Sequence, residues 1–229
     1  ELPSRGPKPT LTADEIARVA IRIADAEGLD YVSMQRIARK VGVTTMALYR
    51  YFSNKSELVA LMIDIAGEPV PDLGAAAKRG RSKAWRSKLT EWTCQCSSIY
   101  RDHPWFLQAA TARRRLMGPN ELAWFDAALG ALAETGLTAP QQHQAFLLLI
   151  GHVRTNAEFT AGEAQGLSAG EWMSGMTRLL KRYGERYPSL LAAIDSGAFN
   201  PSPNDGLDFG LECILDGIES LASKRRKES

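Results

Sequence analysis

The side chains with the clearest binding chemistry follow one another closely in the first quarter of the chain. Tyr49, Arg50 and Tyr51 stand in a row, and Lys55 follows. Their hydroxyl, guanidinium and ammonium groups can all donate hydrogen bonds to phosphate oxygens, and arginine can also bind the edge of guanine. Over residues 33–56 the chain has five basic residues and no acidic one. This segment is a candidate phosphate-binding face, although on charge alone a solvated surface fits equally well.

Other reactive residue types show no pattern typical of catalysis or metal binding. His103, His143 and His152 have no metal-ligand spacing with one another or with cysteine. Cys94 and Cys96 are two residues apart on an expected helix, so their side chains point in different directions. Three cysteines in 229 residues argue against a disulfide framework and favour a reducing compartment. We therefore expect no enzyme, no metal, no cofactor and a cytoplasmic location.

The bulk composition is that of an ordinary globular protein. Hydrophobic residues make up 45% of the chain and charged residues 24%. No apolar run approaches the roughly 20 residues that span a bilayer, so we expect no membrane partner. The net charge of +2 is too small to identify a binding partner. The distribution of charge is therefore more informative than its sum.

Helical signals surround the candidate face. Thr12 and Glu15 have the spacing of a capping box, and apolar residues then recur at helical spacing until Gly28. Asn54 is placed to cap a later helix, which should end before the proline-containing stretch 67–74. These signals predict that the candidate face lies between two well-defined helices.

The segment between those helices has the form of a helix-turn-helix. Expected helices at about 33–41 and 44–51 flank Gly42, and glycine accepts the left-handed backbone at a helix end without steric cost. In that unit the second helix enters the major groove, which is wide enough for a helix and displays a distinct pattern for each base pair. Leu48 and Phe52 lie four residues apart and should face the core. A plain three-helix bundle could carry the same apolar pattern.

The rest of the chain also reads as helices. No stretch alternates convincingly with period two, so we expect no strands. Glycine and proline mark the breaks between the expected helices, which cover about 82–102, 104–116, 120–135, 139–161, 169–186, 188–196 and 205–223.

A dense set of residues in the first 62 positions resembles the N-terminal domain of the TetR family of regulators. The resemblance is carried by Glu27-Gly28, Met34-x-x-Ile37-Ala38, Val41-Gly42-Val43, Leu48-Tyr49-x-Tyr51-Phe52 and Asn54-Lys55-x-x-Leu58. It implies that DNA contacts fall on Gln35, Thr44, Thr45, Met46, Ala47, Tyr49, Arg50, Tyr51 and Lys55. It also implies a DNA-binding transcription regulator whose partner is double-stranded operator DNA.

The later residues resemble the C-terminal domain of the tetracycline-repressor branch of that family. The resemblance is carried by Tyr100-Arg101-Asp102-His103-Pro104, Gly136-Leu137, Arg186-Tyr187-Pro188 and the run DFGLECILDGIESL. In that branch two helices form a four-helix bundle with their copies in a second subunit. The resemblance therefore implies a homodimer formed through helices at about 139–161 and 205–223. Both helices are apolar over a wide arc, as a helix with partners on two sides must be.

The resemblance further implies a repressor that a small-molecule effector, bound in the C-terminal domain, releases from a palindromic operator. The ligand-binding candidates are Trp92, Cys96, Trp105, Trp124, His152 and Asn156. Core filling is the alternative for each tryptophan, and the dimer interface is the alternative for His152 and Asn156. Leu107 stands where the tetracycline-binding members have a magnesium-binding histidine, so a metal–tetracycline effector does not carry over to this chain.

The expected fold class is all-α, with an N-terminal three-helix helix-turn-helix DNA-binding domain before a larger helical ligand-binding and dimerisation domain. The expected parts are a flexible basic arm at 1–10, the DNA-binding domain at 11–66, the larger domain at 75–223 and a basic tail at 224–229. Two alternatives stay open: a small-molecule binding protein with a vestigial helix-turn-helix, and a protein that coats DNA of any sequence. Competition between random DNA and the protein's own upstream DNA separates the second alternative from a regulator.

Overall fold

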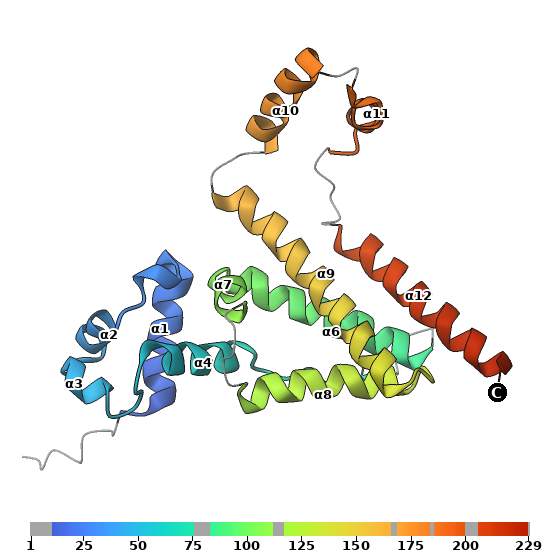
Figure 1. The fold of residues 1–229 in the computed structure, drawn as a ribbon. Coiled ribbons are helices and arrows are strands. Elements are labelled where there is room, and N and C mark those ends of the chain that lie inside the picture. The colour runs from blue at the N-terminus through green and yellow to red at the C-terminus, as the bar shows by residue number, and fades with distance from the viewer. Residues whose placement is uncertain are drawn as a thin grey trace, which may run out of the picture. The chain divides into compact units, whose positions relative to one another are not determined.

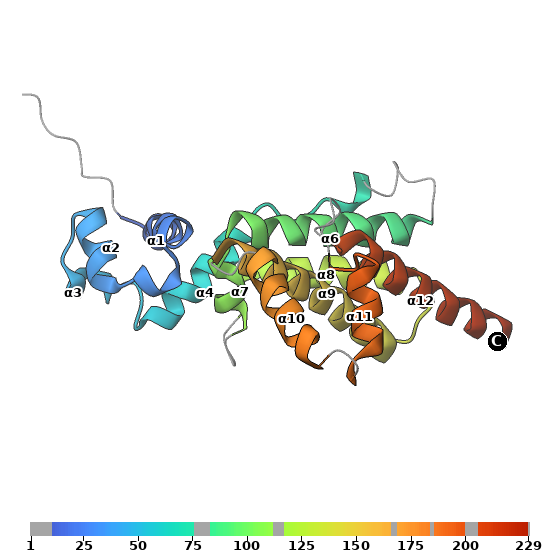
Figure 2. The same cartoon turned by 90° about the horizontal axis from the view of Figure 1, so that it is seen from above.

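The computed structural model describes residues 11–75, 83–111, 117–165, 169–183, 186–199 and 206–228. Every regular element in these ranges is a helix, which confirms the predicted all-α class (Figures 1 and 2). The chain forms two compact units, 1–146 and 147–229. The expected arm at 1–10 lies outside the described residues. Within the described ranges, none of the helices combines the length and apolar character that crossing a membrane requires.

The first unit begins with the predicted helix-turn-helix. Its elements are α1 (Ala13–Glu27), the short 3₁₀ helix η1 (Leu29–Tyr31), α2 (Met34–Val41), α3 (Thr45–Leu48) and α4 (Lys55–Ala66). The capping box is confirmed, because the Thr12 side chain accepts from the Glu15 amide at 3.1 Å and the Glu15 carboxylate accepts from the Thr12 amide at 2.8 Å. Gly42 ends α2 with φ +75°, the left-handed conformation that favours glycine.

A small apolar core holds these helices together. Leu48 and Phe52 are buried, as predicted, and so are Ile16 of α1, Ile37 of α2 and Leu58 of α4. Burial of one such side chain stabilises the fold by about 1.5–3 kcal/mol. The core therefore fixes the direction of α3 even though α3 itself is only one turn long.

The helix α3 is shorter than the prediction of about 44–51. It ends at Leu48, and the chain then turns tightly, because the Arg50 amide bonds to the Ala47 carbonyl at 3.3 Å and the Tyr51 amide to that of Leu48 at 2.9 Å. These bonds to the third residue back are typical of 3₁₀ geometry at helix ends. The next helix cap, at Asn54, needs extended backbone (φ −160°), so the chain must leave the helix before it.

The rest of the first unit consists of α6 (Ala84–Asp102), α7 (Trp105–Ala110), α8 (Pro119–Ala133) and the start of α9 (Ala139–Gln165). Figures 1 and 2 show α6 and α8 running beside each other, with α4 leading from the helix-turn-helix toward α8. Leu89 and Trp92 of α6 and Leu132 of α8 are at most 2% exposed and form the centre of this core. The expected last residues of α7, 112–116, lie outside the described ranges.

The second unit holds the rest of α9 together with α10 (Ala169–Tyr183), α11 (Pro188–Asp195) and α12 (Leu207–Glu228). The predicted break at 162–166 is wrong at its start, because α9 continues through Gly162 to Gln165. A single glycine inside a helix costs only about 1 kcal/mol, which the rest of a long helix offsets. The expected basic tail at 224–229 mostly belongs to the end of α12.

Candidate nucleic-acid interface

The side chains predicted to contact DNA gather along α3 and the turn after it. We call residues Thr44–Ala47 and Tyr49–Tyr51 the α3 edge. Met46 is 76% exposed, Tyr49 47% and Tyr51 40%, although large apolar and aromatic side chains are usually covered. Thr44 caps α3, because its hydroxyl oxygen accepts from the Ala47 amide at 3.2 Å. The cap holds the exposed tip in one conformation.

Most of the basic residues near the α3 edge are exposed. Arg39, Lys40 and Arg50 are exposed, and none has an ion-pair partner within the described part of the chain. Arg36 differs, because it pairs with Glu27. The exposed cations can therefore bind phosphates without first breaking an intramolecular pair.

Two predicted DNA contacts also have partners inside the protein. The Tyr51 hydroxyl donates to the Leu11 carbonyl at 2.9 Å and ties the start of α1 to the α3 edge. The Lys55 ammonium donates to the Leu29 carbonyl at 3.3 Å and ties α4 to η1. A hydroxyl can still accept, and an ammonium has three donors, so these bonds leave capacity for a phosphate.

Gln35 belongs to α2 rather than to the α3 edge, and it lies near the start of that helix. It is exposed and lies two residues after Ser33, whose hydroxyl caps α2 by accepting from the Arg36 amide at 3.3 Å. The amide groups at a helix start attract phosphate oxygens. The position of Gln35 is therefore compatible with a contact to DNA backbone or a base edge.

A buried carboxylate that no sequence pattern had predicted joins the helix-turn-helix to α8. Asp64 of α4 is 4% exposed. Its Oδ1 accepts from the Asn120 amide at 2.8 Å and from the Glu121 amide at 3.1 Å, at the start of α8. Negative charge is stabilised at a helix N-terminus, so this carboxylate caps α8 from another element. A methyl group at Gly118 would lie 2.2 Å from the carboxylate, so the close approach requires glycine there.

Two indole groups continue this connection. Trp124 of α8 donates to the Gly67 carbonyl, just after α4, at 2.7 Å. Trp92 of α6 donates to the Trp124 carbonyl at 2.9 Å, and the two rings meet edge to face with centroids 6.1 Å apart. We call Asp64, Gly67, Asn120 and Trp124 the α4–α8 junction. Through it, the helix that begins beside the α3 edge is bonded to α8 and from there to α6.

The ligand-binding candidates fall into both units. Trp92, Trp124 and Trp105 are buried in the first unit, where the Trp105 indole donates to Asp25 of α1 at 2.6 Å. Cys96 is also buried there, on α6. The indole N–H groups of all three tryptophans have protein acceptors, so any contact of these rings with an effector would use their faces or edges.

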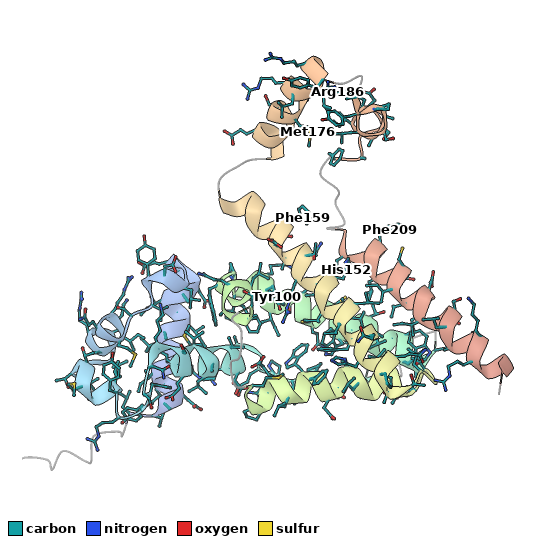
Figure 3. The ribbon with its side chains drawn as sticks, in the orientation of Figure 1. Tyr100, His152, Phe159, Met176, Arg186 and Phe209 are labelled. Atoms are coloured by element: carbon teal, nitrogen blue, oxygen red, sulfur yellow. The ribbon has the colours of Figure 1, made fainter. Side chains whose placement is uncertain are left out.

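The two polar candidates lie in the second unit. His152 of α9 donates from Nε2 to the Leu207 carbonyl at 2.8 Å, where α12 begins, and its ring packs against Gly210. Asn156 is half-buried one turn further along α9. Figure 3 labels His152 between α9 and α12. His152 thus serves a contact within the chain, and its role toward an effector or a second subunit stays a prediction.

Two known sequence families match the chain. The family described as "Bacterial regulatory proteins, tetR family" matches residues 16–62, and "Tetracyclin repressor-like, C-terminal domain" matches residues 80–222. The HTH-type transcriptional repressor DrrR1 of Streptomyces coeruleorubidus is 36% identical over 234 positions, covering 99% of this chain and 84% of that protein. The tetracycline repressor protein class A from transposon 1721 of Escherichia coli is 27% identical over 225 positions, covering 94% and 92%.

Solved structures show the same fold. ActR of Streptomyces coelicolor in complex with actinorhodin superposes with a TM-score of 0.78 at 24% identity, covering 93% of this chain and 99% of that one. The same protein without ligand gives a TM-score of 0.75 at 24% identity and the same 93% coverage of this chain.

Proposed function

Because the chain belongs to the TetR family of bacterial transcription regulators, and so is a DNA-binding protein rather than an enzyme, we propose that it represses transcription from a palindromic operator until a small molecule binds. In this proposal residues 11–66 bind the operator in the cytoplasm, and residues 75–223 bind the effector and a second subunit. The observation that supports it most is the α3 edge, whose large side chains are exposed beside cations that have no ion-pair partner among the described residues.

Each residue of the interface has a chemistry that suits one part of DNA. Tyr49, Tyr51 and Lys55 suit phosphate oxygens, and Arg50 suits guanine or the backbone. Gln35, Thr44 and Thr45 can hydrogen-bond to bases or phosphates. Met46 and Ala47 cannot do so through their side chains, and they suit the methyl group of thymine.

The proposed dimer rests on apolar side chains of the second unit. The exposed fractions of Leu147 and Leu148 on α9 are 45% and 60%, and those of Phe209 and Leu221 on α12 are 80% and 50%. Figure 3 shows Phe209 at the start of α12. Exposed apolar side chains on two helices are typical of a surface that a second subunit covers. Two-fold symmetry also suits a palindrome, whose half-sites lie about 34 Å apart.

The proposed effector site rests on the matched C-terminal family and on a solved relative of the same fold that holds actinorhodin. The α4–α8 junction supplies a bonded route from α8 to α4. A ligand that shifts α8 would therefore act on α4 as well, and α4 begins beside the α3 edge.

Titration of labelled upstream DNA at two salt concentrations tests the DNA assignment. We expect Tyr49→Ala and Lys55→Ala to weaken binding to specific and random duplexes alike, and Lys55→Ala to reduce the salt dependence, because it removes one phosphate contact. Light scattering of Phe209→Glu, run in parallel, tests the dimer. Unchanged DNA affinity in both interface variants would overturn the assignment, and equal wild-type affinity for upstream and random DNA would favour a DNA-coating protein.

A further inference from the structure

The Thr93 hydroxyl of α6 is buried without a hydrogen-bond partner. Thr93 is 0% exposed, and its Oγ1 is the one buried side-chain N or O atom without a partner in the described ranges. A helical threonine commonly donates to the carbonyl one turn back, and Thr90 of the same helix does so, to Arg86 at 2.9 Å. An unpaired buried hydroxyl destabilises a protein, so a retained one needs an explanation, such as a ligand.

Thr93 is not an isolated polar group on the buried face of α6. Ser97 lies one turn further along and Tyr100 about one turn beyond it, so the three hydroxyl-bearing residues form a row, which we call the hydroxyl row. Ser97 is 8% exposed and Tyr100 6%. A buried face that only filled the core would carry apolar residues at these positions.

Aromatic rings flank the hydroxyl row. Trp92, next to Thr93, meets Phe146 of α9 edge to face, with centroids 5.9 Å apart, and Phe146 meets Phe125 at 4.4 Å. Tyr100, labelled in Figure 3, meets Phe106 of α7 at 5.2 Å. These contacts all lie within the first unit. Flat apolar surfaces near the unpaired Thr93 hydroxyl suit a flat molecule that carries an oxygen atom.

The buried residues of α6 indicate what charge a ligand can carry where it meets this helix. The buried residues of α6 are Trp85, Leu89, Trp92, Thr93, Cys96, Ser97 and Tyr100, none of which carries a formal charge at neutral pH. A charged ligand group placed against this face would lose its hydration without gaining an opposite charge. Since α6 itself offers no opposite charge, we expect the part of the ligand that meets the hydroxyl row to be uncharged.

From these observations we propose that the hydroxyl row is the polar subsite of the effector site, and that the effector is a flat aromatic molecule with an uncharged carbonyl or phenol oxygen bonded by Thr93. The proposal rests on the proposed function, since it names the ligand class of that site. Thr93 donates to a carbonyl oxygen of the effector, and Ser97 has a hydroxyl for a second oxygen one helical turn away.

A matched pair of probes tests the proposal. Fluorene and 9-fluorenone share a flat tricyclic skeleton and differ by one carbonyl oxygen. Equilibrium dialysis against the full-length chain measures the affinity for each. We expect the wild type to bind 9-fluorenone about tenfold more tightly than fluorene, because only the ketone accepts from Thr93. We expect Thr93→Val to bind the two probes equally.

Thermal unfolding of the same variants separates a ligand contact from a structural one. Thr93→Val replaces an unpaired hydroxyl by a methyl group of similar size, so its Tm should stay within about 2 °C of the wild type or rise. Thr90→Val is the control: it removes a made hydrogen bond, and its preference for 9-fluorenone should match the wild type. A clear fall in Tm for Thr93→Val would show that the hydroxyl is already bonded in the free protein and would overturn the proposal.

The remaining outcomes are also decisive. If the wild type binds neither probe, or binds both equally, the hydroxyl row does not select an aromatic ketone and the proposal is wrong. Titration of upstream DNA without any probe separates this failure from that of the proposed function. If the wild-type protein binds this DNA specifically but shows no preference between the probes, the proposed function as a regulator stands and only the proposed ligand class is wrong.

Discussion

The α3 edge and the α4–α8 junction lie in the same unit, but polar groups are exposed at the first and buried and hydrogen-bonded at the second. At the α3 edge, Tyr49 and Arg50 are exposed, and neither side chain has a polar partner within the described ranges. At the junction, the Asp64 carboxylate and the Trp124 indole are buried and bonded within the chain. The first arrangement leaves binding capacity for another molecule, and the second uses it to hold two elements together. Substitutions should therefore separate affinity from stability.

The largest effect is expected at the junction. Asp64→Ala removes the acceptor of the Asn120 and Glu121 amides, which lie part-buried at the start of α8. We expect a loss of about 3 kcal/mol in the free energy of unfolding, measured by urea denaturation. Asp126→Ala, on the exposed side of the same helix, is the control and should change stability by less than about 0.5 kcal/mol. A loss as small as that for Asp64→Ala would show that the junction does not hold α8.

The next largest effect is on affinity at the α3 edge. Arg50→Ala removes an exposed guanidinium, so we expect operator affinity to fall about 10- to 100-fold at constant salt while the free energy of unfolding stays within about 0.5 kcal/mol. Fluorescence anisotropy measures the affinity. Arg178→Ala, an exposed arginine of α10, serves as the control for loss of one positive charge. An equal loss of operator affinity in both variants would show that Arg50 contributes only its positive charge and no specific contact.

A smaller effect is expected at the cap of α3. Thr44→Ala removes the acceptor of the Ala47 amide, and an N-cap contributes about 1 kcal/mol to stability. Thr44→Ser keeps the hydroxyl oxygen and should retain most of that contribution. Urea denaturation of both variants tests the role of the cap, which would be refuted by serine and alanine variants of equal stability.

The smallest effect is expected at Tyr51, which is exposed like the rest of the α3 edge but also forms a hydrogen bond within the chain. Tyr51→Phe removes the bond to the Leu11 carbonyl at a partly exposed position, so we expect a loss of about 0.5 kcal/mol in stability. If the hydroxyl also contacts a phosphate, operator affinity falls as well. A stability loss without any change in affinity would assign Tyr51 to the fold alone and remove it from the interface.

Helix starts were predictable from the sequence because their signals are local. Thr12, Ser33, Thr44 and Asn54 each accept from the amide three residues further on. The end of α3 was not predictable in this way, because the geometry of the following turn, rather than the apolar period, sets it. The continuation of α9 through Gly162 likewise depends on its whole length rather than on one residue.

The candidate site shows the same difference between features that local residues determine and features that depend on distant residues. The α3 edge could be predicted because one short segment supplies nearly all its residues. The junction joins Asp64 to Asn120, 56 residues later, and no local sequence pattern predicts a contact between residues so far apart. An acidic residue inside the apolar run of α4 was the available sign that Asp64 has an internal partner. No sequence pattern indicated that the Thr93 hydroxyl lacks a partner, since a lone threonine on a helix usually bonds to its own backbone.

Selection of duplexes from a random DNA library by the full-length chain tests the central claim most directly. We predict that a palindromic motif is enriched, with half-site centres about one helical turn apart, and that wild-type protein binds it at least about 1,000-fold more tightly than random duplex at the same salt. The Arg50→Ala variant should lose most of that preference. Enrichment of no motif, or equal affinity of the wild type for selected and random duplexes, would contradict the account.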